Sequence, residues 1–232
     1  MALTAIVGVV DEAFECATCE RMKSTNTTPQ ITSKVTITLS FVFLGILPFS
    51  TASPRPDSAD VLKDKDGNVY SSRRLSDGKR WMTQNLKTKT TGSHCYDDDE
   101  ANCDRFGRLY TWEAAKQACQ MLGDGWRLPT NDEWRDMAKQ YGGVGDDSVN
   151  TGKSAFKALL ESGNSGFNAL LGGNRDSDGK YRRIDAHGFY LSSTEGDSGG
   201  VWFYNFAKGS QALYRHSDGD KSRACSVRCL KP

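Results

Sequence analysis

Apolar residues recur at helical spacing in residues 112–122. Three of them fall on one helical face: Ala115, Cys119 and Leu122. Thr111 stands in the N-cap position, where its side chain can accept a hydrogen bond from an unpaired backbone N–H, and Gly123 follows where the pattern stops. The segment predicts an amphipathic helix that begins at Trp112 and ends before Gly123.

A second and stronger helix signal begins at Thr130. Pro129 restricts the backbone just before it. Thr130 and Glu133 are three residues apart, the spacing of a capping box, in which each side chain accepts a hydrogen bond from the backbone N–H of the other residue. Apolar residues then repeat at i, i+3, i+4 and i+7: Trp134, Met137, Ala138 and Tyr141. We expect this helix, like the first, to bury its apolar face against a sheet.

Short apolar runs bounded by turn residues occupy the rest of the chain. Asp-Gly pairs at 66–67 and 77–78 predict a meander of hairpins from Val61. Residues 153–162 predict a third, weaker helix. Strand-like segments follow after Gly163: 167–173, 180–185, 188–194, 201–207, 211–217 and 224–230. This order predicts an α+β fold, with two to three helices packed on a curled, mostly antiparallel sheet whose last strand returns towards the first.

Residues 35–52 form the longest apolar run, which is preceded by lysines and closed by small residues. Threonine, serine and proline residues interrupt it, so it is typical of a signal-peptide h-region rather than of a membrane span of about 20 apolar residues. We therefore predict an N-terminal leader at 1–52, with a possible true start at Met22, a linker at 53–60 and one domain at 61–232. The alternative is an uncleaved leader, which would be the chain's only attachment to a membrane.

Composition adds little that is specific. A net charge of +1 at pH 7 and 37% hydrophobic residues are typical of a globular protein and give no indication of nucleic acid or an anionic membrane as a partner. Of the seven cysteines, Cys16 and Cys19 fall in the leader. If the chain is secreted, we expect the cysteines after the leader to form disulfides.

Residues 107–134, GRLYTWEAAKQACQMLGDGWRLPTNDEW, resemble the core of the Fibrobacter succinogenes major paralogous domain family. Other segments match that family in the same order, and the resemblance runs from about Val61 to the C-terminus: 64–70, 81–86, 94–107, 166–173, 188–194 and 226–229. The family is in turn similar to the formylglycine-generating enzyme and C-type lectin-like folds. The resemblance therefore implies a C-type lectin-like α+β domain.

The resemblance also implies a disulfide between Cys119 and Cys229, which ties the first helix to the last strand as in C-type lectin-like domains. We expect Cys95 to pair with Cys103 and to close a small acidic loop. Cys225 is then left unpaired. Spacing alone leaves the connectivity open and does not indicate a role for Cys225.

Similarity to formylglycine-generating enzymes raises an enzymatic alternative. Those enzymes use a pair of cysteines near the C-terminus to bind copper as thiolates and activate oxygen, and Cys225 and Cys229 have a similar but not identical spacing. A disulfide between Cys119 and Cys229 would remove this site. We therefore expect no cofactor and no catalytic residues, and keep a copper-dependent oxidase as the alternative.

The segment GDSGG at 196–200 resembles the nucleophile segment of chymotrypsin-like proteases, and GSHC at 92–95 resembles the setting of their histidine. A Ser-His-Asp triad needs an aspartate that orients the histidine, and the chymotrypsin-like fold needs two β-barrels. Here predicted helices lie between His94 and Ser198 in the sequence. We expect a variable loop at 196–200, and a serine protease is a less favoured alternative.

Two acidic segments resemble metal sites. Residues 174–185 have the ligand spacing of an EF-hand loop, from Asn174 to Asp185, but no helices flank them and Asp-Gly is the commonest hairpin turn. The acidic residues 97–100 lie in the predicted small disulfide loop. We expect a turn and a solvated loop, hence no metal site, and leave open whether Asn174 to Asp185 binds calcium.

Residues 201–220 lie where lectin-like folds present their variable, ligand-contacting face. Four residues there are of types that commonly contact ligands, although some of them must alternate into the core: Trp202, Tyr204, Tyr214 and Arg215. We therefore expect a secreted or cell-surface binding module that recognises an unknown extracellular protein or glycan. A purely structural surface protein is a further alternative.

Overall fold

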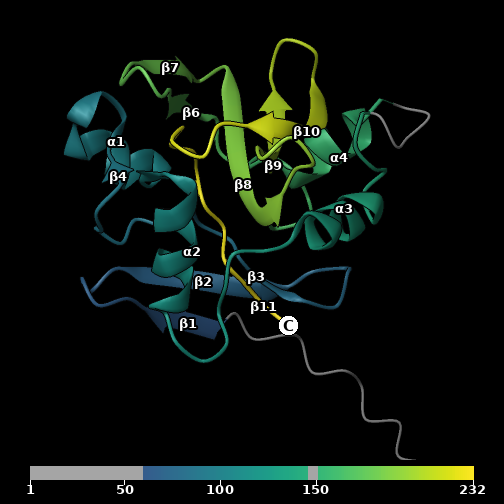
Figure 1. Cartoon of the computed structure of the whole chain (residues 1–232). Coiled ribbons are helices and arrows are strands. Elements are labelled where there is room, and N and C mark those ends of the chain that lie inside the picture. Colours follow the sequence, from purple (N-terminus) through teal and green to yellow (C-terminus); the bar gives the residue numbers. More distant parts are fainter. Residues whose placement is uncertain (1–59, 146–150) are drawn as a thin grey trace, which may run out of the picture. The chain divides into compact units, whose positions relative to one another are not determined.

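The computed structural model describes residues 60–145 and 151–232. The predicted leader, and the predicted linker up to residue 59, lie outside the described residues. Two principal β-sheets lie one above the other in Figure 1, with helices packed beside them. The predicted α+β class is confirmed.

The first sheet contains, in order, β1 (Asp60–Lys63), β2 (Val69–Arg74), β3 (Arg80–Met82) and β11 (Leu230–Lys231), all antiparallel. The two predicted Asp-Gly turns join its first three strands. Gly67 and Gly78 have φ angles of 86° and 79°, a conformation that glycine adopts without steric cost. Because β11 pairs with β3, the end of the chain returns to the sheet that contains the first described strand.

The second sheet contains, in order, β10 (Ala212–Gly219), β9 (Val201–Ala207), β8 (His187–Glu195), β6 (Gly172–Arg175) and β7 (Tyr181–Ile184). Within this sheet β6 and β8 pair in parallel, and the other neighbouring strands are antiparallel. A separate pair consists of β4 (Ser93–His94) and β5 (Leu109–Tyr110).

The expectation of a single curled sheet is therefore wrong. The segment before β11 explains the division, because residues 224–226 form only isolated bridges, to Tyr110, Arg175 and Tyr190, instead of a continuous strand. The chain there runs from the second sheet down to the first (Figure 1).

The three predicted helices are present as α2 (Trp112–Gln120), α3 (Asn131–Lys139) and α4 (Lys153–Leu159), and a fourth was not predicted. This additional helix, α1 (Glu100–Phe106), lies in the cysteine loop after a 3-10 turn, η1 (Tyr96–Asp98), so the loop is not simply irregular. The Asp99 side chain caps it by accepting a hydrogen bond from the Ala101 N–H. Its seven residues bury only Cys103 and Phe106, too few for an apolar period to show in the sequence.

Thr111 occupies the N-cap position of α2, but the prediction that its side chain caps the helix is wrong. No backbone N–H of the helix donates to the Thr111 side chain, and the N–H of Trp112, the first residue of the helix, donates to the carbonyl of Lys221 at 3.1 Å. A segment distant in the sequence thus satisfies one of the unpaired donors of the first turn, although not the N–H of the second or third helical residue that a side-chain cap would bind.

The capping box of α3 is confirmed. The Glu133 N–H donates to Thr130 Oγ1 at 3.2 Å, and the Thr130 N–H donates to Glu133 Oε2 at 2.9 Å. Partial burial by itself raises the pKa of Glu133, but hydrogen bonds from Arg127 and Thr130 outweigh it and hold the pKa below its ordinary value of 4.5. The stabilisation by this carboxylate is therefore present above pH 4.5 and is lost as the pH falls through the lower folded-state pKa.

Replacing Thr130 by alanine is expected to lower the free energy of unfolding by about 1 kcal/mol, since the Glu133 N–H loses its acceptor. Urea unfolding at neutral pH measures this loss. Thr130→Ser is the matched control, because serine keeps the hydroxyl acceptor and should stay close to the parent. Equal stability of the alanine variant and the parent would contradict a stabilising cap.

Aromatic side chains fill the space between the two sheets. Trp134 of α3 is fully buried, and its indole N–H donates to the Leu191 carbonyl at 3.2 Å. Four rings lie with their centroids 5.1, 5.5, 5.7 and 4.9 Å from it: Trp81, Phe167, Tyr190 and Tyr204. This cluster joins the first sheet to the inner face of the second, the face turned towards the first sheet.

Arg228 is also fully buried in this core. Its Nε donates to Asn85 Oδ1 at 2.6 Å, and its two terminal nitrogens donate to the backbone carbonyls of Met82, Phe167 and Asn168. Burial lowers the pKa of Arg228 to about 10, which leaves the guanidinium charged at neutral pH. A buried cation therefore joins the chain before β6 to the first sheet.

Candidate functional site

Tyr204 is fully buried, so the prediction that it contacts a ligand is wrong. Its hydroxyl donates to the Asn131 carbonyl at 2.8 Å, and its ring stacks on Trp134. Side chains alternate between the two faces of a strand, and Tyr204 belongs to the inner set. Its aromatic ring stabilises the core.

Trp202 and Arg215 lie at the margin of the same inner face and are half-buried. Arg215 pairs with Tyr204 across β9 and β10, and its guanidinium carbon lies 5.0 Å from the centroid of the Trp202 ring. A cation thus covers part of the tryptophan ring, which reduces the aromatic surface open to a ligand.

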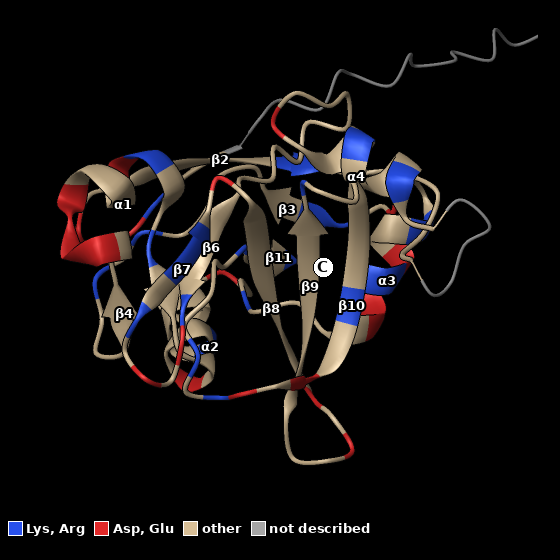
Figure 2. Ribbon diagram, turned by 90° about the horizontal axis from the view of Figure 1, so that it is seen from above, with Lys and Arg blue, Asp and Glu red and all other residues tan. Residues whose placement is uncertain are grey.

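Tyr214 lies on the opposite, outer face of the second sheet. Six side chains of β8, β9 and β10 form what we call the outer-face cluster: His187, Phe189, Phe203, Asn205, Tyr214 and His216. The register pairs Asn205 with both Phe189 and Tyr214, so these side chains lie side by side. Strands β8, β9 and β10 face the viewer in Figure 2, with β3 and β11 behind them.

Ring contacts hold the outer-face cluster together. The His187 ring stacks on Phe189 with centroids 5.4 Å apart, and the Phe203 ring stacks on His216 at 5.0 Å. His187 Nδ1 lies 3.0 Å from Asn205 Oδ1, within hydrogen-bonding distance. The two phenylalanines are almost buried, while the other four side chains are half-buried and reach solvent.

Two arginines border the cluster. The guanidinium carbon of Arg183 lies 5.8 Å from the Phe189 ring centroid, and that of Arg223 lies 6.0 Å from the Phe203 centroid. Arg223 also pairs with Asp176 at 3.0 Å, which fixes its position. The cluster therefore combines aromatic rings, imidazoles, an amide and a hydroxyl on a rigid sheet, as in sites that bind polar ligands.

Three residues of the outer-face cluster were not predicted from the sequence: His187, Asn205 and His216. Each is unremarkable in the sequence, and only the strand register shows that they share a face with Tyr214. The available signal was the alternation of β9, because Asn205 stands one residue from the buried Tyr204.

Residues 174–185 include the end of β6, the Asp-Gly turn and the whole of β7, so they form a hairpin turn as expected. Gly179 in that turn has a φ of 83°. Arg182 pairs with Asp176 at 2.7 Å and with Asp178 at 2.8 Å. Arginines thus engage the carboxylates that a calcium ion would need.

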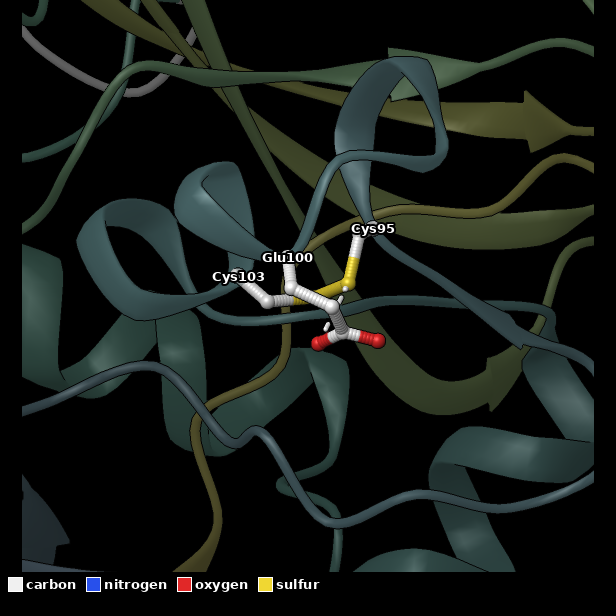
Figure 3. A group of neighbouring side chains, drawn as sticks. All are labelled: Cys95, Glu100 and Cys103. Atoms are coloured by element: carbon white, nitrogen blue, oxygen red, sulfur yellow. Dashed lines mark hydrogen bonds between the residues drawn. A yellow bond between two sulfur atoms is a disulfide. The ribbon is translucent and has the colours of Figure 1, made fainter.

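Both predicted cysteine pairs are at disulfide distance, with S–S lengths of 2.03 Å for Cys95–Cys103 and 2.04 Å for Cys119–Cys229. Figure 3 shows the carboxylate of Glu100 beside the first pair, and its Oε2 lies 3.3 Å from Cys95 Sγ. Sulfurs bonded to each other cannot bind a metal as thiolates. The group of Cys95, Glu100 and Cys103 is therefore a disulfide with a neighbouring carboxylate.

Cys225 is free and fully buried, and burial raises the pKa of its thiol to about 12. A copper site similar to that of the formylglycine-generating enzymes would need Cys225 and Cys229 as thiolates. The disulfide to Cys119 occupies one sulfur, and burial keeps the other protonated.

Residues 196–200 form the turn between β8 and β9, as expected for a loop. The Gly196 N–H donates to the Gly200 carbonyl at 2.8 Å, and Gly199 has a φ of 79°. His94 lies in β4, and within the described part of the chain no hydrogen bond joins it to Ser198. The segment resembles a protease motif in sequence but has the geometry of a hairpin turn.

Within residues 60–145 and 151–232, no helix is long and apolar enough to cross a membrane. The two disulfides are compatible with an extracytoplasmic location, because disulfides persist in oxidising compartments.

No curated protein and no solved structure is significantly similar to the chain. The model of one family, the Fibrobacter succinogenes major domain, matches residues 70–231. The match extends from β2 to β11 and includes both disulfides and the outer-face cluster. The chain therefore belongs to the Fibrobacter succinogenes major domain family.

Proposed function

We propose that the protein is a secreted or cell-surface binding module with a C-type lectin-like fold, and that its outer-face cluster binds an extracellular glycan or protein without catalysis. The observation that supports this is the row of half-buried polar and aromatic side chains on β8, β9 and β10. Of the helices in the described part of the chain, none lies in front of these strands in Figure 2, although Phe189 and Phe203 belong to the same buried apolar cluster as Trp112 of α2.

The chemistry of the cluster suits recognition. Tyrosine and histidine rings offer flat surfaces on which sugar rings or apolar side chains pack, and the Asn205 amide and the imidazoles supply directional hydrogen bonds. Since the side chains stand on paired strands and stack on one another, they lose little conformational entropy when a ligand binds.

Two other functions make different demands. A copper-dependent oxidase similar to the formylglycine-generating enzyme needs two thiolates near the C-terminus, which conflicts with the bond from Cys229 to Cys119. A structural surface protein would keep the outer-face cluster but show no saturable binding. An array of glycans and extracellular proteins separates the binding module from the structural protein.

Replacing Tyr214 and His216 together by alanine is expected to weaken binding of any ligand found on the array by tenfold or more, on the order of 1.4 kcal/mol. Biolayer interferometry with the purified protein measures the affinity. Met121→Ala, at a residue 45% exposed next to α2, is the control and should bind like the parent. If Trp202→Ala abolished binding while the Tyr214 and His216 double variant bound normally, the result would contradict the outer-face cluster as the binding site.

A further inference from the structure

A hollow of about 540 Å³ lies between α4 and the turn that joins β9 to β10. Lysines stand around it and apolar residues line it: Lys153, Lys157 and Lys208, with Phe156, Leu160 and Leu171. The three lysines are exposed, whereas Phe156 is almost buried and the two leucines are half-buried. The hollow therefore has a cationic rim and an apolar floor.

The positive charge of this hollow is not balanced. No carboxylate of the described residues lies within 4.0 Å of the three lysine ammonium groups. The basic side chains of the adjoining surface, in contrast, have carboxylate partners: Arg105 pairs with Asp185 at 3.2 Å, and Lys87 pairs with Asp104 at 3.8 Å. The unpaired lysines thus concentrate positive charge at one place on a nearly neutral protein.

Local structure brings the lysines together. Lys153 and Lys157 are four residues apart in α4 and share one side of the helix, where like charges are mildly destabilising. Lys208 is held in the β9–β10 turn, where its N–H donates to the Ala186 carbonyl at 3.0 Å. Blue segments mark the lysines of α4 in Figure 2. Since the arrangement does not favour folding, it points to an anionic ligand.

The hollow continues into a groove. A second hollow of about 270 Å³ shares Leu160, Leu171 and Lys208 with the first. A third, of about 400 Å³, shares four residues with the second: Arg105, Phe106, Glu161 and Leu170. The second and third hollows are also lined by carboxylates, Glu161, Asp185 and Asp104, so the positive charge is concentrated in the first hollow and its neighbours can contact only uncharged parts of a longer ligand.

We propose that this hollow binds the acidic group of a polysaccharide, a uronate carboxylate or a sulfate ester, as a second site separate from the outer-face cluster. The lysines pair with the anion, and the apolar floor packs against the C–H face of the sugar ring. Ser162 and Gln211, which also line the hollow, can hydrogen-bond to hydroxyls. An extended acidic peptide fits less well, because α4, a loop and a turn line the hollow and offer no strand edge for pairing.

The test uses the full-length protein and four immobilised polymers: polygalacturonate, dextran sulfate, neutral dextran and polyglutamate. We expect binding to at least one acidic polysaccharide, weakening as salt is added, and none to neutral dextran. Replacing Lys153, Lys157 and Lys208 by glutamine should lower the affinity by roughly tenfold or more. The double variant at Tyr214 and His216 should bind these polymers normally.

A matched control separates a built site from general charge attraction. Lys63, Lys89 and Lys180 are exposed and line none of the three hollows, and replacing them by glutamine changes the net charge by the same amount. This control should keep the parental affinity. Binding to dextran sulfate but not to polygalacturonate would identify a sulfate ester as the ligand group. Binding to polygalacturonate but not to dextran sulfate would identify a carboxylate. Equal losses in both triple variants, no binding to either acidic polysaccharide, or stronger binding to polyglutamate would each overturn the proposal.

Discussion

Replacing Arg228 by methionine is expected to lower the free energy of unfolding by about 3–5 kcal/mol, the cost of breaking a buried charged interaction. Methionine fills much of the space but donates no hydrogen bonds. It leaves four acceptors, three of them buried, without the donor that Arg228 supplies: Asn85 Oδ1 and the carbonyls of Met82, Phe167 and the half-buried Asn168. The ring of Phe167, whose centroid lies 4.7 Å from the guanidinium carbon, also loses its cation contact.

Urea unfolding followed by tryptophan fluorescence measures this loss, and a variant that yields no folded protein represents its upper extreme. Arg105→Met is the control, because Arg105 is exposed and its ion pair with Asp185 is worth less than about 1 kcal/mol. Arg228→Lys should fall between methionine and the parent, since an ammonium keeps the charge but cannot reach all four acceptors. A methionine variant as stable as the control would show that the buried guanidinium contributes no stability.

Removing the disulfide between Cys119 and Cys229 is expected to lower the free energy of unfolding by about 4–5 kcal/mol in the chain-entropy estimate. The bond joins residues 110 apart, so it greatly restricts the unfolded chain. It also ties α2 to the segment just before β11, and both cysteines are fully buried. Replacing both cysteines by alanine tests this without leaving an unpaired thiol.

The second disulfide provides the comparison. Cys95 and Cys103 are only 8 residues apart, for which the same estimate gives about 2.5 kcal/mol. Denaturant unfolding of both double alanine variants should therefore show the larger loss for the longer loop. Reductant should lower the stability of the parent by more than that of either variant. The opposite order of losses would mean that packing at α1, rather than loop length, dominates.

Local features were predictable because they depend on residues close together in the chain. The capping box of Thr130 and Glu133 is confirmed, and so are the turns at Gly67 and Gly78. The short helix α1 was missed, because it buries too few residues to produce a period. The side-chain cap at Thr111 was predicted wrongly, because no backbone N–H of α2 donates to its hydroxyl, and the hydrogen bond from the Trp112 N–H to the carbonyl of Lys221 depends on a segment far along the chain.

The candidate site was predictable only in part. Tyr214 was among the expected contact residues, and it lies beside His216 and Asn205 in the outer-face cluster. Tyr204 was placed among them as well, although it packs on Trp134 in the core. Composition could not separate the two tyrosines, because the same residue type serves as a contact residue on one face of a sheet and as core on the other.

The helices with strong periods, the hairpin turns, the α+β class and the family could be predicted from the sequence, because all of them are encoded in local patterns or in the order of motifs. Three features became visible only in the folded protein: the division of the strands into two sheets, the burial of Tyr204, and the position of Lys208 beside the lysines of α4 around one hollow. The physical reason is that strand register and side-chain packing depend on residues far apart in the chain, and a shift of one position exchanges the two faces of a strand.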